Sequence, residues 1–201
     1  MTYGKISVSN TRTAILKAAI HLFPQRGYEG VSMRNIAGAV DISTPALYNH
    51  FKDKQSLYIA VITDTFENKS ELLLQALTGQ DKPIIRLQNF ITRLSEVLHD
   101  DPDFHRLMQR ELLDGDEKRL RYLAQEVFGY SFEHLMNLLI ELKPDCDAHS
   151  LSVIIIGMVQ KPYELNPLDR FFPGSQPAHN TPAYITQQVM AVVSAYLGDR
   201  P

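Results

Sequence analysis

Two short helical segments, separated by only three residues, constrain this chain more than any other feature of its sequence. Ser32 is a favourable N-cap for the first segment, whose apolar residues recur with helical spacing at Met33, Ile36, Ala37 and Val40. The residues Asp41-Ile42-Ser43 then predict a tight turn. A second short helix should follow, with Thr44 as its N-cap and Pro45 at its first helical position. Its inward-facing side chains would be Leu47 and Phe51.

A longer helix precedes this pair, at about residues 11–25. It has one apolar face, formed by Ile15, Ala18, Ala19, Leu22 and Phe23, and Gly27 suits the left-handed residue that follows a helix. Two short helices across a tight turn, packed on a longer helix, are the plan of a helix-turn-helix. Such a motif needs an apolar inner face as an anchor and small or polar outer side chains that fit the major groove of DNA. The spacing therefore predicts a DNA-reading domain.

The rest of the chain also reads as helical, because no run alternates as a strand would. Another helix should begin near Lys54, and further helices are expected at about 84–98, 104–113, 118–142, 148–160 and 183–197. Residues 161–182 contain five prolines and are expected to be mostly irregular. We therefore predict an all-α fold, with a three-helix helix-turn-helix domain over residues 1–57 and a larger helical domain over residues 58–201.

Charge is distributed unevenly between these two parts. Residues 1–57 contain seven Lys/Arg and three Asp/Glu, which gives 7 − 3 = +4. The remainder has 13 − 20 = −7, and the whole chain −3. A basic head on an acidic body fits a DNA-binding domain joined to a domain with another role, although chance unevenness would explain the same numbers.

Composition favours a cytoplasmic location. Cys146 is the one cysteine, which allows no intramolecular disulfide and supplies no cysteine cluster for zinc. The first ten residues are polar and lack the apolar core of a signal peptide. The longest apolar stretch, 153–159, is far shorter than the roughly 20 residues that span a bilayer, so no membrane association is expected.

The helix-turn-helix segment resembles the DNA-binding domain of TetR-family regulators. From Gly27 to Leu57 the sequence reads GYEGVSMRNIAGAVDISTPALYNHFKDKQSL, and its last twelve residues match the family pattern xLYxHFxxKxxL. The pair Ile36-Ala37 matches a second family position. The resemblance covers about residues 11–62. Two positions depart from it: Val40 replaces a small residue, and Asp41 replaces a glycine.

The resemblance implies roles for nine residues in binding double-stranded DNA. Tyr48, His50 and Lys54 resemble phosphate contacts, and Ser32 and Arg34 resemble backbone contacts, with Arg34 also able to reach a base. The remaining side chains would face base edges: Thr44, Pro45, Ala46 and Asn49. The alternatives are that Tyr48 caps the small core, and that Asn49 and His50 are surface residues without contacts.

The resemblance also implies that the C-terminal domain dimerises and binds a small molecule of unknown identity. The helix containing Leu151–Val159 is apolar nearly all round and, with the last helix, would pair with a second copy in a four-helix bundle. The homodimer would bind a palindromic operator, as a repressor. Both helices could instead belong to the monomer core.

A set of apolar residues is the candidate lining of the ligand pocket: Phe90, Leu94, Phe104, Met108, Phe128, Phe132 and Met158. Each could equally be an ordinary core residue. Arg110 could meet an anionic ligand, but pairing with Asp114 on the surface is the preferred interpretation.

No cofactor, metal site or catalytic residue is expected. His99, Asp101, Asp103 and His105 lie close in sequence, but they straddle a helix end and read as a solvated turn. A glycine-rich phosphate loop, HExxH and GxSxG are all lacking, so the chain is not expected to be an enzyme. Two alternatives stay open: an all-helical enzyme or ligand carrier with a structural N-terminal bundle, and a DNA-binding dimer with no effector.

Overall fold

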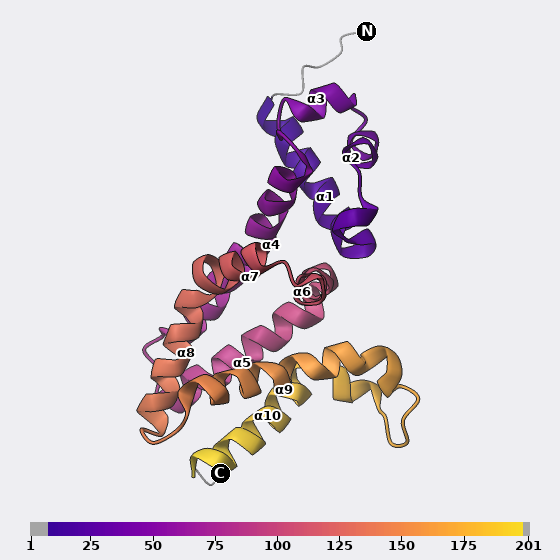
Figure 1. Cartoon of the computed structure of the whole chain (residues 1–201). Coiled ribbons are helices and arrows are strands. Elements are labelled where there is room, and N and C mark those ends of the chain that lie inside the picture. The colour runs from indigo at the N-terminus through magenta and orange to yellow at the C-terminus, as the bar shows by residue number, and fades with distance from the viewer. Residues whose placement is uncertain (1–7, 199–201) are drawn as a thin grey trace. The chain divides into compact units, whose positions relative to one another are not determined.

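The computed structural model describes residues 8–198 and shows an all-helical chain (Figure 1). No strand occurs within these residues, which confirms the predicted fold class. The helices in chain order are α1 (Val8–Gly30), α2 (Met33–Ala39), α3 (Thr44–Tyr48), α4 (Lys54–Leu77), α5 (Pro83–Asp100), α6 (Pro102–Asp114), α7 (Glu117–Tyr122), the π-helical turn η1 (Leu123–Val127), α8 (Gly129–Leu142), α9 (Ala148–Asp169), the 3-10 turn η2 (Pro177–Asn180) and α10 (Pro182–Leu197).

The first helix buries the face that its sequence predicts. Ile15, Ala19 and Phe23 are fully buried. The helix continues to Gly30, five residues past the predicted end, but Gly27 breaks its geometry with a φ of 71°. A positive φ is costly for residues with a side chain, so glycine allows the last turn of α1 to change direction here.

The two short helices form as predicted, with one correction at a cap. Ser32 caps α2 reciprocally: its hydroxyl accepts from the Asn35 N–H at 3.1 Å, and the Asn35 side chain accepts from the Ser32 N–H at 2.9 Å. The cap of α3 is Ser43, whose hydroxyl accepts from the Ala46 N–H, and not Thr44 as predicted. Thr44 is therefore the first helical residue and Pro45 the second. Proline is tolerated at the second position because the N–H groups of the first turn have no acceptor within the helix.

The turn between α2 and α3 depends on Asp41, which has a left-handed φ of 53°. Asp and Asn adopt this conformation more readily than other residues with a side chain. The turn therefore survives the departure from glycine, and it sets the direction of α3. Leu47 on α3 and Phe51 just after it are buried, as predicted.

The chain folds into two compact units. The first comprises residues up to Glu67 together with Asp103–Arg121, and the second comprises Asn68–Pro102 with the residues from Tyr122 onward. This division falls within α4. The predicted boundary between residues 57 and 58 separates DNA binding from ligand binding and dimerisation, and it remains a prediction. The first unit is larger than the predicted head because α6 forms hydrogen bonds to α1 and α4 within it, and Arg119 of α7 bonds to Glu111 of α6.

The second unit is built around α5. Its buried face consists of Leu87, Phe90, Ile91, Leu94, Val97 and Leu98, and α8, α9 and α10 pack against it. The sequence misplaced two boundaries here. The predicted helix 118–142 is interrupted by η1 and Phe128, and the predicted helix 148–160 continues to Asp169 through Pro162 and Pro167. Each proline removes one hydrogen bond, which the packing of this long helix tolerates.

Within residues 8–198, no helix is long and apolar enough to cross a membrane.

Replacing Asp41 with valine should destabilise the first unit by about 1–2 kcal/mol, because a β-branched residue is strained at this positive φ. Asp41→Gly is the matched control and should unfold at a urea concentration equal to or above that of the parent. If the two variants unfold at the same urea concentration, the turn does not impose a left-handed φ at residue 41.

Candidate nucleic-acid interface

All nine residues predicted to contact DNA lie on α2, on α3 and the two residues after it, or at the start of α4. Tyr48 is 49% exposed, and the side chains of Ser32, Arg34, Pro45 and Asn49 are also exposed. The others are partly buried: Thr44, Ala46, His50 and Lys54. The exposure of Tyr48 argues against its being a core residue.

Buried side chains on the inner side of α3 hold this helix in place. Leu47 is fully buried and Phe51 is 4% exposed. The Arg12 guanidinium of α1 lies over the Phe51 ring, 5.0 Å from its centroid. These contacts fix the end of α3 relative to α1, so Tyr48 and Asn49 project from a rigid support.

Lys54 is the first residue of α4, as predicted. Its ammonium lies 4.2 Å from the centroid of the Tyr28 ring and 3.9 Å from the carboxylate of Glu29. The helix start beside it is capped: the Asp53 carboxylate accepts from the Ser56 N–H at 2.7 Å, and the Ser56 hydroxyl accepts from the Asp53 N–H. A helix N-terminus with a neighbouring ammonium favours an anion such as phosphate.

The hydrogen bonds from Ser56 lower the pKa of the Asp53 carboxyl below its usual value. The backbone donor contributes most, and it is present only when α4 begins at this residue. The charged carboxylate thus stabilises the start of the helix that contains Lys54.

Sequence analysis missed a polar cluster behind Lys54. Glu111 of α6 is completely buried, and its carboxylate accepts hydrogen bonds from the Tyr58 hydroxyl and from Arg119 Nε, the latter at 2.7 Å. Arg119 also pairs with Asp114 and Asp116. The only signal in the sequence is the density of charges over residues 111–119, which usually marks a solvated face.

Arg110 corrects a second prediction. Its side chain does not pair with Asp114 but donates to two main-chain carbonyls at the end of α1, from Nε to Pro24 at 2.7 Å and from Nη2 to Gln25 at 2.9 Å. Pro24 within α1 and the break at Gly27 leave carbonyls in this region that need donors from outside the helix. Arg110 thus fastens α6 to α1.

The residues predicted to line a ligand pocket are divided between the two units. Phe104 and Met108 lie on α6 in the first unit, where the Phe104 ring meets Phe66 edge-on at 5.2 Å. Phe90 and Leu94 are buried on α5 in the second unit. Phe132 of α8 faces the His149 ring, and Phe128 follows η1.

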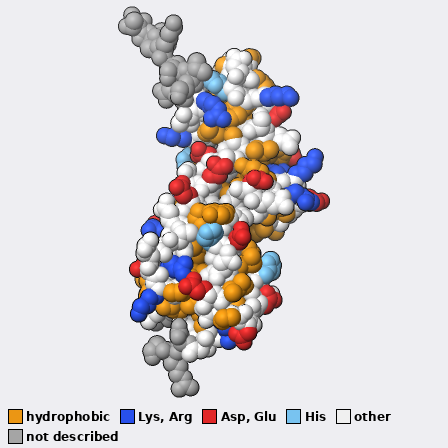
Figure 2. Space-filling model, turned by 90° about the vertical axis from the view of Figure 1, so that its left-hand side faces the viewer, with side chains coloured by type: hydrophobic (Ala, Val, Ile, Leu, Met, Phe, Trp, Pro, Cys, Tyr) orange, Lys and Arg blue, Asp and Glu red, His pale blue; other side chains and the backbone are white. Residues whose placement is uncertain are grey.

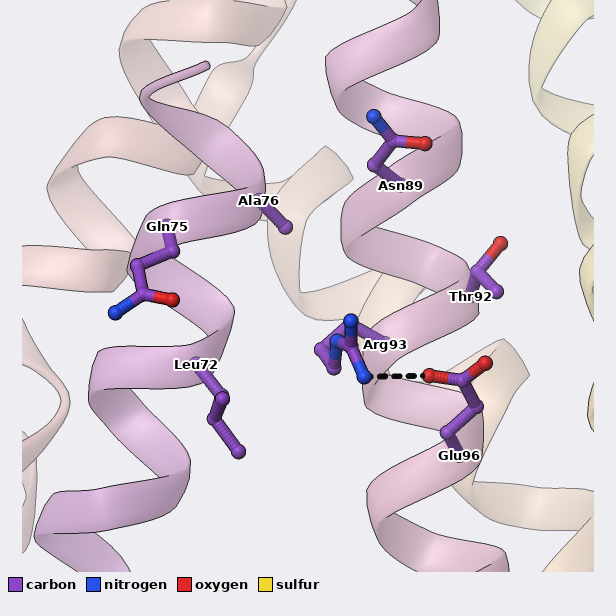
Figure 3. A pocket seen from close by; sticks show the side chains of 7 residues that line it. All are labelled: Leu72, Gln75, Ala76, Asn89, Thr92, Arg93 and Glu96. Atoms are coloured by element: carbon purple, nitrogen blue, oxygen red, sulfur yellow. Dashed lines mark ion pairs between the residues drawn. The ribbon is translucent and has the colours of Figure 1, made fainter.

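The pockets of the second unit include two of similar size. One, of about 410 Å³, lies between α4 and α5 and is lined by polar side chains with an Arg93–Glu96 ion pair (Figure 3). Leu72, Gln75 and Ala76 face it from α4. The other, of about 430 Å³, lies between the end of α9, η2 and the start of α10. Met158, one of the predicted residues, lines this second pocket together with Pro162, Leu165 and Tyr184.

Large apolar side chains are exposed on α9 and α10, which pack against each other in the second unit. On α9, Leu151, Ile155 and Val159 are buried, but Val153 and Ile154 are more than half exposed. On α10, Val192 and Tyr196 are exposed to a similar degree. Figure 2 shows hydrophobic side chains at the surface among charged ones on the face that it presents.

The turn with His99, Asp101, Asp103 and His105 does not gather its side chains as a metal site. Asp101 pairs with Lys69 at 3.0 Å, and Asp103 pairs with His21 and Arg106. In the part of the chain that the structure describes, no three His, Cys, Asp or Glu side chains are arranged to hold a metal ion.

Comparisons with known proteins agree with this geometry. Residues 15–61 match the family model described as "Bacterial regulatory proteins, tetR family". The chain is 34% identical to the HTH-type transcriptional regulator RutR of Escherichia coli (strain K12) over 116 residues, which are 57% of this chain and 54% of that protein. The chain thus spans about half the length of the curated relatives that it matches.

Solved structures share the fold over nearly the whole chain. A TetR-family transcriptional regulator from Bordetella parapertussis 12822 superposes with a TM-score of 0.70 at 22% identity, over 91% of this chain and 93% of that one. AibR, solved in complex with isovaleryl coenzyme A and operator DNA, superposes with a TM-score of 0.71 at 21% identity, over 90% and 96%.

The fold contains a helix-turn-helix whose second helix, α3, has exposed side chains. The match over residues 15–61 makes this N-terminal part of the chain similar to the TetR family of bacterial regulatory proteins. The relatives are named as regulators and not as enzymes.

Replacing Asp53 with alanine should lower the urea midpoint of the first unit at neutral pH, because α4 loses its cap. The pKa of Asp53 is lowered in the folded state, so its contribution is fully present above its unfolded value of 3.8 and is lost as pH falls through the folded value. Urea titrations of parent and variant at several pH values measure this. A difference between them that grows as pH falls would contradict it.

Proposed function

We propose that this chain is a cytoplasmic, homodimeric transcription repressor that binds a palindromic operator and responds to a small molecule. The observation that carries the proposal is α3, a short helix with buried Leu47 below it and exposed Pro45, Tyr48 and Asn49 above. Its support by α1 and α2 and the position of Lys54 at the start of α4 agree with it.

Base recognition would come from the outward side of α3. The major groove admits one α-helix, provided that the helix presents small or polar side chains. Asn49 can donate to and accept from one adenine edge, whereas Thr44, Pro45 and Ala46 offer apolar contact to a thymine methyl. Arg34 at the start of α2 would reach a phosphate or a base.

Phosphate contacts would position this helix. Tyr48 and His50 flank Asn49, and Ser32 lies at the start of α2. Lys54 would meet a phosphate at the start of α4. These contacts carry no sequence information but fix the register of α3, and they make affinity fall steeply with salt.

Dimerisation through α9 and α10 would cover the apolar side chains that the single chain exposes. Val153, Ile154, Val192 and Tyr196 are each more than half exposed. Gly157, one turn beyond Val153, has open space where a side chain would begin, so a second helix could approach closely. A two-fold pair of heads would read half-sites one or more DNA turns apart, roughly 34–36 Å per turn.

A small molecule bound in the second unit would change operator affinity only if it binds the DNA-competent and incompetent states unequally. AibR, a structural neighbour, has been solved with both an acyl coenzyme A and operator DNA. The two pockets of the second unit and the residues predicted from sequence are the places to look for such a ligand in this chain.

Tyr48→Ala and Lys54→Ala should each weaken binding to the DNA upstream of the gene, without loss of the dimer. Lys54→Ala removes one charged phosphate contact from each of the two protomers, so the slope of log affinity against log salt should become less steep by about 1.8. Tyr48→Ala removes an uncharged contact, so it should lower the affinity and leave the slope near the parental value. Fluorescence anisotropy with labelled duplex over a salt series measures both quantities.

Tyr130→Ala and Lys118→Ala are the matched controls, since both remove exposed side chains of the same type elsewhere in the chain. They should bind DNA as the parent does. Parental affinity and slope in the Tyr48 or Lys54 variant would withdraw the role of that residue, and absence of salt-dependent binding in the parent would overturn the proposed function.

Val192→Glu should convert the dimer to monomers, because it places two charges in the apolar contact between α10 helices. Sedimentation equilibrium gives the mass directly, and Gln88→Glu on an exposed position of α5 is the control for added charge. If the Val192 variant has the mass of a dimer, α10 is not part of the interface.

A further inference from the structure

The ammonium of Lys54 is held before any DNA arrives. It lies over the Tyr28 ring at 4.2 Å from the centroid and beside the Glu29 carboxylate at 3.9 Å. A lysine side chain free in solvent loses rotamer entropy when it is fixed on a ligand. A ring that already orients the side chain removes part of this cost from the binding step.

The Tyr28 ring is in turn fixed by its neighbours within the first unit. It meets the Tyr58 ring edge-on at 4.9 Å, and the Phe23 ring lies 6.3 Å away. The guanidinium of Arg119 lies 5.6 Å from the Tyr28 centroid. Two cations, from α4 and from α7, therefore both contact this one aromatic ring.

Arg119 occupies this position because acids surround it. Its Nε donates to the fully buried carboxylate of Glu111, and its other nitrogens lie 3.3 Å from Asp114 and 3.5 Å from Asp116. The Arg119 side chain is only 14% exposed. It is therefore placed to organise the interior of the unit and not to touch DNA itself.

Arg119 is the cation that pairs with the buried carboxylate of Glu111. Glu111 also accepts from the Tyr58 hydroxyl, and burial together with this carboxylate raises the pKa of Tyr58, so that the hydroxyl stays protonated as a donor. Without the guanidinium, a buried carboxylate and two surface acids would be left beside the Tyr28 ring.

We propose that Arg119 is a positioning residue for DNA binding: anchored by Glu111, it fixes the Tyr28 ring, and the ring holds the Lys54 ammonium at the start of α4 where a phosphate binds. This inference rests on the proposed function, in which Lys54 contacts phosphate. No DNA contact is proposed for α7. The inference assigns to this helix an effect on DNA affinity that acts through the Lys54 side chain.

The test compares Arg119→Gln with Arg121→Gln, which removes the same charge from the same helix at an exposed position paired with Glu117. Binding to a random-sequence duplex at low salt is measured, because such binding depends on phosphate contacts alone. Arg119→Gln should make the slope of log affinity against log salt less steep by up to about 1.8, as Lys54→Ala does in the dimer, and Arg121→Gln should leave it at the parental value.

A double-mutant cycle separates positioning from general damage. In the Lys54→Ala background, Arg119→Gln should change the dissociation constant by less than about twofold, because the side chain through which it acts is gone. A full additional loss in that background, or a parental slope for Arg119→Gln alone, would overturn the proposal. Circular dichroism melts establish that each variant is folded. If Arg119→Gln does not fold, Arg119→Lys, which keeps a charge beside Glu111, replaces it.

A measurement without DNA distinguishes failure of this inference from failure of the proposed function. Reductive ¹³C-dimethylation keeps the lysine charges, and the Lys54 methyl signal, assigned with Lys54→Arg, should show an upfield ring-current shift from Tyr28. Arg119→Gln should move it to the position of exposed lysines, and Arg121→Gln should not. A Lys54 signal unaffected by Arg119→Gln would refute positioning even if the parent binds DNA. The predicted shifts in a parent that does not bind DNA would refute the proposed function alone.

Discussion

The N-terminal unit depends on the burial of two side chains at and just after α3. Leu47 and Phe51 are removed from water on the inner side of a helix that is only five residues long. A helix of this length cannot persist alone, because nucleation costs more than a few hydrogen bonds return. Fully burying a leucine or phenylalanine side chain contributes about 1.5–3 kcal/mol, so the anchor creates the helix as well as its orientation. The outward residues are presented to a duplex only as a consequence.

Charge acts on this scaffold at two levels. The basic excess of residues 1–57 attracts a polyanion over a distance set by salt, whereas the position of Lys54 decides whether attraction becomes a contact. That position follows from uncharged as well as charged groups, since an aromatic ring and a capped helix start hold the ammonium. Among the acids of this unit, Glu111, Asp114 and Asp116 are paired with Arg119, which offsets part of their negative charge.

Prediction succeeded where short-range rules decide the structure. The spacing of apolar residues predicted α2 and α3. The turn between them was predicted because aspartate at position 41 can adopt a left-handed φ. The predicted N-cap of α3, Thr44, was one residue too late. Ser43 and Thr44 are both favourable caps, and proline is tolerated at either of the first two helical positions, so the sequence did not distinguish them. In the second unit the prolines of α9 suggested an irregular segment, but tertiary packing of Ile155 and Val159 supports a helix that runs through them.

The sequence by itself determined an all-helical chain with a helix-turn-helix at one end, because periodicity and capping are written in neighbouring residues. Tertiary structure alone decided that α6 and α7 join this head. The contacts responsible, Arg110 to the end of α1 and Glu111 to Tyr58, connect residues that lie 53 to 86 positions apart. Such pairs leave no periodic trace, and an arginine or glutamate in a charged run looks the same whether it is solvated or buried against a partner.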